Sequence, residues 1–544
     1  MTPTNSLPPA GAQSLVSEDT YRVGQRHNLD GTTEILSIKT ANGEKLIGDE
    51  TLLRSFPGEL SEEGASSWIF EERLLKSSKL NPEQRAHLQK MALLSNAWPG
   101  AEVRTLVSQG PANNRIDLTI VGDGYTTAEK DRFFEDAQRL TREMFVGKAF
   151  ASYLALFNVH AVFVPSKDSG ITDTQTKDTA LGLYRSPKGS KRAIMPGNAE
   201  AARRALRLAP STDYSILLAN DDFYGGLGGE FAITTRSPNS GSMVLNHELG
   251  HNISEVGEEY DGGDVYQGAN FSRSKDVPWN EWVAGDLKVE KAEILAVSYP
   301  WKNLSSGSVS VPFTLPGAGE NILVVDLSSV GWSSPEEVEI LIDGKLCAYE
   351  GLYTNDRSFF KLTDTSSVGP GKHELIIREK KKDGDNVLAA IRVTAHPKDY
   401  DFTPLKVGAF PIFASGGRFV GYRSTHESCL MRNMRHPNFC SVDQQNIWHN
   451  LLRRISLIDA VKSSRSGATV TASVETPDLA DLSIRWYLAQ SGNEEELTEF
   501  RDKKSWQKDG LATGAKILVK VRFETDEVRK YTKDFEDTAK TQVD

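Results

Sequence analysis

The stretch 246–260, NHELGHNISEVGEEY, decides how this 544-residue chain is interpreted. Residues i and i+4 lie one above the other on one face of an α-helix, so His247 and His251 would direct both imidazoles to one point. An apolar stripe lies on roughly the opposite side of the same helix: Leu245, Leu249 and Ile253. The stretch therefore predicts a helix that buries one face in a core and turns the other towards a cleft.

The two histidines have the spacing of a zinc site. Imidazoles on consecutive turns suit the geometry that two Zn–N bonds of about 2.0–2.1 Å require. Glu248 follows the first histidine, where its carboxylate can hold a metal-bound water without ligating the ion. Zinc lowers the pKa of such a water towards ~7, and a carboxylate base takes its proton as the water attacks a carbonyl. The pattern H-E-x-x-H is therefore typical of zinc peptidases, with Glu248 as the candidate general base.

An acidic pair follows this helix at a distance that suits a third metal ligand. Gly257 is expected to end the helix in a left-handed conformation, after which the chain can turn back. Either Glu258 or Glu259 can then reach the ion. Two histidines and one carboxylate, with water in the fourth position, make a catalytic zinc site. The residues alone do not choose between the two glutamates.

The segments around the motif predict a sheet covered by helices. Strand-like runs occur at 116–121, 157–164 and 214–219, and a helix is expected at about 126–146 after a Thr cap. Strands that alternate with helical stretches are typical of such a layered arrangement. We assign this architecture to residues 111–284, and the segment 399–463 is again mixed and ends in an amphipathic helix at 444–458.

The remaining segments predict further units. Residues 285–398 contain short strand-like runs separated by turn residues, which is typical of a β-sandwich. The other expected units are a disordered tail at 1–19, an N-terminal accessory domain at 20–110 with a strand at 32–39 and a helix at 81–95, and a β-rich C-terminal domain at 464–544.

The composition excludes some classes of partner. The hydrophobic share is 38%, the charged share is 25% and the net charge is −11. An acidic chain is not attracted to nucleic acid or to an anionic membrane surface, so we expect neither partner. No run approaches the ~18 apolar residues that a membrane span needs, and the start of the sequence has no secretory signal as it stands. Three cysteines make no disulfide scaffold, although a Cys429–Cys440 bridge is conceivable and three reduced thiols are as probable.

The active-helix segment resembles the immunoglobulin A peptidase family of metzincin-like zinc metallopeptidases. In that family H-E-x-x-H is followed, several residues later, by an acidic residue and Glu-Tyr, which corresponds here to Glu258-Glu259-Tyr260. The resemblance implies that Glu258 is the third zinc ligand, with Glu in place of the more usual Asp. It also implies a zincin-like (metzincin) catalytic domain formed by residues 111–284 and 399–463, with residues 285–398 as an inserted domain. The expected fold is thus an α+β multidomain protein with this domain and β-sandwich-like accessory domains.

Other segments support the resemblance by their order. Residues 117–126 look like the family's opening strand and turn, and the Gly-rich segment 225–232 lies where such enzymes place an edge strand that pairs with substrate. Residues 422–432 resemble the Met-turn, which makes Met431 the first candidate for the apolar floor beneath the metal and Met434 the second. The segment around Cys440 resembles one that carries a second cysteine in the family, and that cysteine is absent here.

These observations predict a zinc-dependent endopeptidase that acts on protein or glycoprotein substrates. The family name does not make immunoglobulin A the substrate. The alternative is a zincin-scaffold protein with little or no turnover that binds glycans or surface proteins through its β-sandwiches. Two narrower alternatives stay open: a thermolysin-like site whose third ligand lies on a later helix, and sugar-stacking roles for three tryptophans that we expect to be core residues, Trp301, Trp332 and Trp486.

Overall fold

The computed structural model describes residues 98–543 apart from 147–148, 187–191, 264, 318–320, 382–383 and 491–492. Before residue 98 it describes four strands, which pair in the order β3-β2-β1-β4: β1 Thr20–Asn28, β2 Thr33–Thr40, β3 Lys45–Ile47 and β4 Trp68–Lys76. The strand expected at 32–39 is therefore present as β2. The expected tail at 1–19 and helix at 81–95 lie outside the described residues.

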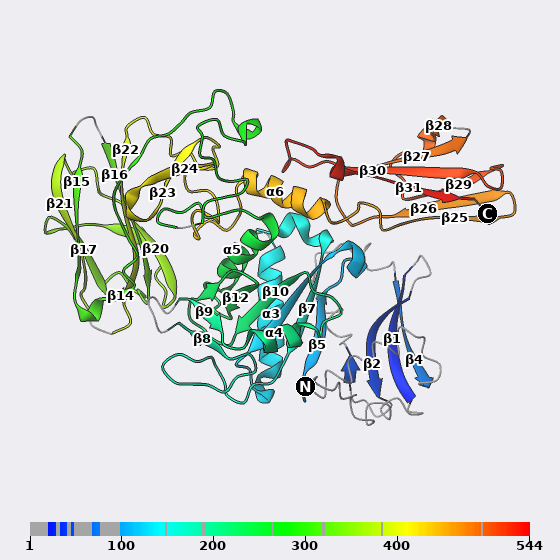
Figure 1. The fold of residues 1–544 in the computed structure, drawn as a ribbon, viewed down its shortest axis with the longest axis horizontal. Helices are drawn as coiled ribbons and strands as arrows, with labels where there is room; N and C mark the ends of the chain where they lie inside the picture. The colour runs from blue at the N-terminus through cyan, green and yellow to red at the C-terminus, as the bar shows by residue number, and fades with distance from the viewer. Residues whose placement is uncertain are drawn as a thin grey trace, which may run out of the picture.

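A six-stranded sheet forms the centre of the molecule, in the order β11-β12-β10-β6-β7-β5 (Figure 1). Its strands are β5 Glu102–Val107, β6 Ile116–Asp123, β7 Phe157–Phe163, β10 Tyr214–Ala219, β11 Gly226–Leu227 and β12 Phe231–Thr235. The inner strands run parallel, whereas β5 and β11 pair antiparallel at the two edges. The three strands predicted from apolar runs are thus neighbours in one sheet.

Helices cover both faces of this sheet because its strands are apolar on both sides. The described α-helices are α3 Lys130–Phe145, α4 Ala199–Leu206, α5 Gly241–Ser254 and α6 Ser441–Leu452. Apolar side chains of α3, α5 and α6 share one core with Ile116, Leu118 and Ile120 of β6. The side chains of α4 pack in a second core with Val121 and Leu217 on the other face. A capping box, in which Thr126 and Glu129 exchange hydrogen bonds, begins the short 3₁₀ turn Thr127–Glu129 that directly precedes α3.

Two further sheets, built from residues 293–397, pack on each other. One has the order β13-β22-β16-β20-β19 with β14 beside β22, and the other has the order β15-β21-β17-β18. Their bounds are β13 Glu293–Ser298, β14 Lys302–Asn303, β15 Val309–Leu315, β16 Asn321–Val330, β17 Val338–Ile342, β18 Lys345–Leu346, β19 Tyr349–Gly351, β20 Arg357–Leu362, β21 Gly371–Glu379 and β22 Val387–Pro397. Alternate residues of both sheets, among them Phe360 and Leu375, form one core of their own together with Trp332. We call this unit the two-sheet unit.

The chain then returns to the centre and ends in two more sheets. The returning segment holds a hairpin of β23 Phe410–Phe413 and β24 Phe419–Arg423, followed by α6, which lies between the central sheet and the C-terminal strands (Figure 1). The last strands form the sheets β25-β26-β29 and β28-β27-β30-β31, with bounds β25 Ala460–Ser466, β26 Thr469–Glu475, β27 Leu482–Gln490, β28 Asn493–Glu496, β29 Ser505–Asp509, β30 Lys516–Phe523 and β31 Glu536–Gln542. A two-stranded ribbon, β8 Leu183–Arg185 with β9 Ile194–Pro196, lies in the loop before α4.

Three local expectations need correction. The described chain is mostly β-strand with few helices, so the α+β description overstates its helical part. Helix α5, the candidate metal helix because it carries His247 and His251, ends at Ser254 rather than near Gly257. Glu255 takes the left-handed conformation (φ 55°), and its N–H bonds to the carbonyl of His251. The helix expected at 444–458 begins at Ser441 and ends at Leu452, where the N–H groups of Arg454 and Ile455 both turn to the carbonyl of Leu451.

No helix in the described part of the chain has the length and apolar character that a bilayer crossing demands.

Candidate metal centre

Helix α5 brings the two histidines of the motif together. His247 is 6% exposed, and its ring centroid lies 4.8 Å from that of His251 one turn later, with the rings nearly perpendicular. The stripe of Leu245, Leu249 and Ile253 is buried in the core that α5 shares with the central sheet. The helix is therefore amphipathic in the sense that the sequence predicted, with its imidazoles on the free face.

Glu258 completes a three-residue group with the histidines. Its Oε1 lies 3.2 Å from His251 Nε2 and its Oε2 lies 3.4 Å from His247 Nε2. One ligand atom from each of the three residues lies within 4.8 Å of the others. Glu258 Oε2 is buried without a hydrogen-bond partner, which is costly unless another group, such as a cation, meets it. The donor set of two imidazoles and one carboxylate fits a zinc ion.

Electrostatics tie the three groups to one another. Burial alone would raise the pKa of Glu258, but the two neighbouring histidines hold it at about 2. Burial alone would lower the pKa of His247, and the carboxylate of Glu258 raises it to about 9. The pKa of His251 is raised for the same reason. Opposite charges thus accumulate at the point where a divalent cation would replace the protons.

Backbone carbonyls fix which nitrogen of each imidazole faces the group. His247 Nδ1 lies 3.3 Å from the carbonyl oxygen of Leu430, and His251 Nδ1 lies 2.8 Å from that of Val256. An Nδ1–H that donates to a carbonyl leaves Nε2 with its lone pair, which is the form that ligates a metal. Both Nε2 atoms face Glu258.

The segment predicted as the Met-turn lies under the metal helix. Met431 is fully buried, and a Cβ atom placed on Gly250 would lie 3.0 Å from its sulfur. The backbone carbonyl of Met431 also accepts a hydrogen bond from the N–H of Glu259. Met434 lies elsewhere, in the wall of the cleft, where its sulfur is 3.9 Å from the hydroxyl of Tyr224. Of the two candidates, Met431 is the one beneath the histidines.

The candidate base Glu248 lies against the edge of the central sheet. Its Oε2 would be 2.3 Å from a Cβ atom on Gly228, in the loop between β11 and β12. The Gly-rich segment therefore forms the edge strand β11 and also allows the carboxylate of Glu248 to approach its backbone closely. Burial is the main cause that raises the pKa of Glu248, and the nearby histidines partly offset it.

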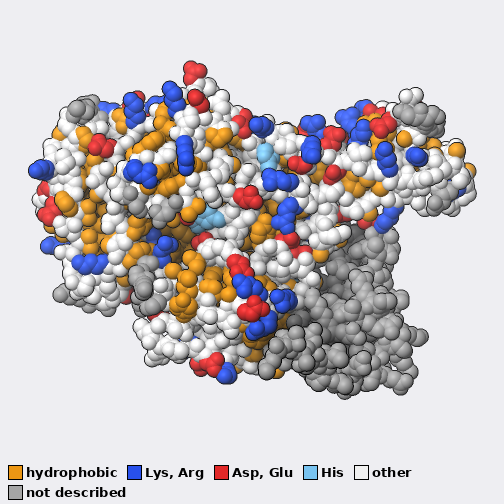
Figure 2. All heavy atoms as spheres, in the orientation of Figure 1, with side chains coloured by type: hydrophobic (Ala, Val, Ile, Leu, Met, Phe, Trp, Pro, Cys, Tyr) orange, Lys and Arg blue, Asp and Glu red, His pale blue; other side chains and the backbone are white. Residues whose placement is uncertain are grey.

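A cleft opens in front of these residues. It is a cavity of about 430 Å³ whose walls include His247, Glu248 and Glu258 on one side. The two-sheet unit supplies the facing wall, with Trp301, Arg357 and Phe359 among its residues. Figure 2 shows the surface hollowed between the two-sheet unit and the central unit. The candidate ligands therefore lie in a groove between two separately folded parts of the chain.

Glu259 points away from this cleft. It is 0% exposed, and its Oε1 accepts a hydrogen bond from Asn270 Nδ2 at 3.1 Å. Its neighbours are Cys429, Cys440 and Asp443 rather than the histidines. The structure thus separates the two glutamates that the sequence could not tell apart. Asn270, the first residue of a glycosylation sequon, is itself fully buried.

Several cleft residues were not singled out by the sequence. Trp332 and Trp486 are core residues as expected, but the same prediction was wrong for Trp301, which lines the cleft. Arg357 carries no local motif, and only the folded two-sheet unit brings it to the histidines. Glu259, Cys429 and Cys440 did carry a signal, since glutamate and cysteine are residue types that ligate metals.

A comparison with protein families agrees with the resemblance found in the sequence. Residues 105–317 match the model of the family described as IgA Peptidase M64, so the recognition of that family is confirmed over this segment. The segment includes the metal helix and Glu258 and ends inside the two-sheet unit. The match indicates a peptidase, of a kind whose members act on proteins. No curated protein matches the chain.

Similarities to solved structures are remote. The chain is 10% identical to an FMN-binding β-glucuronidase from Faecalibacterium prausnitzii L2-6, over 49% of this chain and 35% of that one, with a TM-score of 0.13. The chain is 12% identical to a second β-glucuronidase from Faecalibacterium prausnitzii, over 43% of this chain and 36% of that one, with a TM-score of 0.11. It is 12% identical to a cycloisomaltooligosaccharide glucanotransferase from Paenibacillus sp., over 63% of this chain and 53% of that one, with a TM-score of 0.12. The chain thus spans between a third and about half of these proteins, and scores this low support no inference.

Proposed function

We propose that the protein is a zinc-dependent endopeptidase with a zincin-like catalytic unit formed by residues 111–284 and 399–463. In this proposal residues 285–398 are an inserted domain that forms one wall of the substrate cleft. The observation that carries it is the convergence of His247, His251 and Glu258 in a groove with Glu248 beside them. The peptidase family match over residues 105–317 supports the same reaction class.

His247, His251 and Glu258 would hold the zinc ion, which supplies an acidified water and polarises the scissile carbonyl. Glu248 would be the group that accepts a proton from the attacking water. Its raised pKa suits this step, because a base is most effective when its pKa lies near the working pH. The carbonyls of Leu430 and Val256 keep both imidazoles oriented.

The edge strand β11 suits an extended peptide. It pairs with β12 on one side, while on the other side Gly226 forms an isolated bridge with Ala193, so a substrate strand could add only beyond Gly226, where Gly228 lies against Glu248. A substrate strand added to such an edge would run past the base, with its side chains alternating between sheet and cleft. The competing hypothesis of a non-catalytic binding protein has no use for a buried carboxylate at this position.

The test compares wild-type protein with Glu248→Gln and His251→Ala, using casein hydrolysis and zinc analysis together. Wild type is expected to cut casein and to lose this activity to a chelator. Glu248→Gln is expected to lose at least about 100-fold in rate and to keep its zinc, since base catalysis contributes about 10²–10⁴-fold. His251→Ala is expected to lose both activity and the catalytic zinc. Equal, negligible hydrolysis by all three would overturn the proposal.

A further inference from the structure

A second group of side chains of metal-ligand type lies behind the loop that follows α5 and carries Glu258, which we call the ligand loop. Glu259, Cys429, Cys440 and Asp443 each offer one ligand atom within 4.8 Å of the other three. All four are buried, with exposed fractions of 0%, 0%, 2% and 0% respectively. They come from three segments: the loop after α5, the segment of Met431, and the N-terminus of α6, where Cys440 is the cap residue. We call them the four-residue cluster.

The four-residue cluster contains polar atoms that nothing in the described chain satisfies. Glu259 Oε2 and Asp443 Oδ1 are buried without a hydrogen-bond partner. Their other oxygens are occupied, because Asn270 donates to Glu259 Oε1 at 3.1 Å and Cys429 Sγ lies 2.9 Å from Asp443 Oδ2. A buried carboxylate oxygen without a partner is destabilising. Two such atoms directed into one cluster indicate a missing ligand.

The chemistry of the donors selects the ligand. Two thiols and two carboxylates make four anionic donors, and thiolates favour soft or borderline ions such as zinc over calcium or magnesium. A site with four protein donors is closed, as structural zinc sites are. The three cysteines are unpaired within the described chain, so both thiols of the cluster are available. We propose that Glu259, Cys429, Cys440 and Asp443 bind a second, structural zinc ion.

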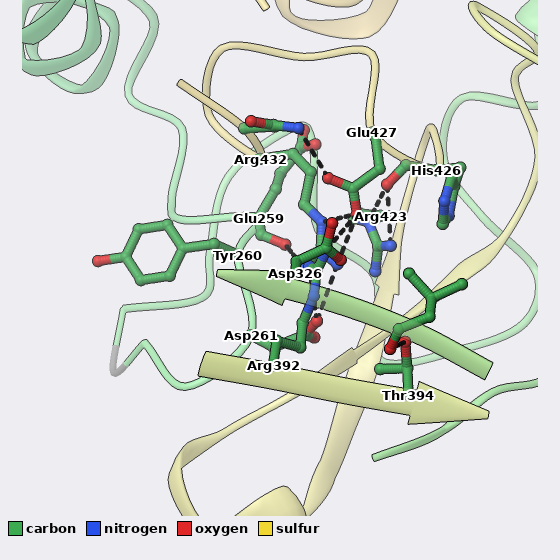
Figure 3. Close-up of polar contacts among 12 residues, drawn as sticks. Glu259, Tyr260, Asp261, Asp326, Arg392, Thr394, Arg423, His426, Glu427 and Arg432 are labelled. Atoms are coloured by element: carbon green, nitrogen blue, oxygen red, sulfur yellow. Dashed lines mark hydrogen bonds and ion pairs between the residues drawn. The ribbon is translucent and has the colours of Figure 1, made fainter. Parts of the chain in front are cut away.

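Neighbouring groups compensate the charge of such a site. Four anionic donors exceed the two positive charges of one ion. Arg432 lies beside the cluster and donates from Nη1 to the backbone carbonyl of Glu259 at 3.0 Å. Figure 3 shows Arg423 and Arg432 close to Glu259, with Tyr260 pointing away from them. Ser424 Oγ lies 3.2 Å from Cys440 Sγ, where it can donate to a thiolate.

The second ion would hold the catalytic ligands in place. Glu258 and Glu259 are consecutive, so an ion bound to Glu259 fixes the loop that presents Glu258. Cys429 precedes Leu430 and Met431, whose carbonyls bond to His247 and to the N–H of Glu259. One ion would therefore join the ligand loop, the segment under the helix, and α6.

The experiment measures zinc per chain after dialysis against metal-free buffer and then against zinc alone. Wild type is expected to hold about two zinc ions, His251→Ala about one, and Cys440→Ser about one. Cys347→Ser is the matched control, because Cys347 is a buried thiol in the two-sheet unit, and it should keep two. Asp443→Asn is a nearly isosteric second variant and should also fall to about one. This count does not depend on peptidase activity.

Cobalt substitution identifies the donors. A thiolate-to-cobalt charge-transfer band is expected in wild type and in His251→Ala, and it should be absent in Cys440→Ser. Wild type with one zinc and no such band would overturn the proposal. So would one titratable thiol per chain after unfolding without reductant, since that number means a Cys429–Cys440 disulfide.

A different observation carries a second inference, which rests on the proposed peptidase function. Arg357, at the start of β20, lines the cleft opposite the histidines. Its guanidinium carbon lies 4.8 Å, 4.7 Å and 5.3 Å from the ring centroids of Tyr224, Trp301 and Phe359. Stacked rings hold a guanidinium in place without neutralising it.

No carboxylate pairs with this guanidinium in the described part of the chain. Its Nε is buried without a partner, and burial is the main cause that lowers the pKa of Arg357. A desolvated cation without an anion is costly, whereas a guanidinium binds a carboxylate through two parallel hydrogen bonds. The geometry points to a substrate carboxylate, from an Asp or Glu side chain or from a peptide C-terminus, as the group that Arg357 receives.

The test uses fluorogenic peptides in which one Glu is moved through the positions around the cleaved bond, each paired with a Gln version. Wild type is expected to prefer Glu at one position by about tenfold or more in kcat/KM, because a charge-assisted hydrogen bond contributes about 1.5–3 kcal/mol. Peptides with amidated C-termini have no terminal carboxylate, so a preference for Glu that persists in them comes from the side chain. Arg357→Leu should lose the preference and still cut the Gln peptides.

The outcomes separate the two proposals. If wild type cuts Glu and Gln peptides equally at every position, with free and amidated ends, the carboxylate site is wrong and the peptidase proposal stands. If it cuts none of the peptides and no casein, the peptidase proposal has failed. Binding of each Glu peptide to Glu248→Gln, with and without Arg357→Leu, then tests the carboxylate site separately. Equal affinity of the two proteins would overturn it.

Discussion

A single missing Cβ atom positions the candidate base. The carboxylate of Glu248 fills the space that a side chain on residue 228 would need, since a Cβ there would lie 2.3 Å from Oε2. The Glu side chain is flexible enough to move away, so a methyl group at this position would displace the carboxylate rather than disrupt the fold. Gly228 therefore sets the position of the candidate base although it carries no functional group.

We predict that Gly228→Ala lowers kcat by at least about tenfold, because small displacements of a catalytic group are costly. Zinc content and the midpoint of urea unfolding should change little. The measurement is casein or peptide hydrolysis beside zinc analysis. Gly369→Ala is the control, since nothing lies within 4 Å of a Cβ at that position. Loss of zinc together with activity in Gly228→Ala would show that the metal site, and not the base, had been disturbed.

At this scale the sequence predicted the histidines and the base but not the choice of glutamate. The i, i+4 spacing fixes two imidazoles on one helix face whatever the rest of the chain does. Glu258 and Glu259 follow in a loop, where no period applies. Their backbone N–H groups bond to different segments, to the carbonyls of Val265 and Met431, so the two side chains diverge. Only tertiary structure supplies that difference.

At the scale of the element, helix α5 depends on a residue from the two-sheet unit. Asp356, 3% exposed, lies at its N-terminus. One carboxylate oxygen accepts from the hydroxyls of Ser237 and Ser240, the cap residue, and the other accepts from the N–H of Tyr224. A carboxylate at a helix N-terminus also interacts favourably with the helix dipole. The N-terminus of α5 is thus held by the loop between β19 and β20, because Asp356 lies 116 residues after Ser240 in the sequence.

We predict that Asp356→Asn destabilises the protein by about 1–3 kcal/mol, because an amide NH₂ would face donors that need an acceptor. The affinity for zinc should fall as well, since α5 carries two ligands. Urea unfolding and competition with a zinc chelator measure the two effects. Asp364→Asn, an exposed position in the same two-sheet unit, should do neither. Unchanged stability in Asp356→Asn would mean that the contact is dispensable.

The sequence was most informative on strands and least informative on helix ends. Apolar runs such as 116–121 became buried central strands because both faces of a covered sheet are apolar. Gly257 was expected to end α5, yet Glu255 takes the left-handed position while Gly257 instead has its N–H bonded to the carbonyl of Gln267. Close backbone approach, and not a turn, explains that glycine, since a Cβ there would lie 2.6 Å from the nitrogen of Gln267.

At the scale of the whole molecule, a buried charge network joins the two-sheet unit to the ligand loop (Figure 3). Arg392 of β22 pairs with Asp326 of β16 at 2.6 Å, with Glu427 at 2.9 Å and with Asp261 at 3.3 Å. Arg432 pairs with Asp261 at 2.8 Å and with Glu427 at 3.0 Å. Asp261 lies three positions after Glu258, so the network connects the wall of the cleft to the metal site.

We predict that Arg392→Met destabilises the protein by about 1.5–3 kcal/mol, because Asp261, Asp326 and Glu427 each lose one of their arginine partners. Catalytic activity should fall at temperatures where the rest of the chain stays folded. Thermal unfolding and hydrolysis rates measure both effects. Arg378→Met is the control, because Arg378 forms an exposed pair with Glu339 on the same unit and such pairs contribute about 0–1 kcal/mol. Equal effects of the two variants would contradict the role of the network.

Acid should also weaken this contact between the two-sheet unit and the ligand loop, which we call the junction. His396 is 4% exposed, and burial together with nearby arginines lowers its pKa to about 3. An unfolded histidine has a pKa of about 6.5, so between these values the unfolded chain binds a proton that the folded chain does not. The stability is therefore complete above about pH 6.5 and falls by about 1.4 kcal/mol per unit as the pH decreases. His426 nearby has its pKa lowered to about 2 and acts in the same direction.

The measurement is urea unfolding at pH 7.5 and pH 5. Replacement of His396 by Phe, which suits its contacts with the rings of Tyr400 and Phe402, should reduce the stability lost at pH 5 by up to about 2 kcal/mol. The same loss in wild type and variant would show that His396 does not titrate in this range.

This junction could not be predicted from the sequence. The run of short strands at 285–398 indicated a sandwich by its spacing, but its docking depends on Asp326, Asp356 and Arg392, which carry no local pattern. Charged residues on strands are usually exposed, and only the assembled molecule shows which of them are buried between units.

The position of Leu430 has a consequence for biogenesis. Its carbonyl meets His247 across 183 residues of sequence, with the whole two-sheet unit translated in between. At roughly 5–20 residues per second, a ribosome needs about ten to forty seconds to make that segment. A nascent chain therefore carries its histidine helix for that time without the floor that orients it. The order of synthesis delays completion of the metal centre until most of the polypeptide exists.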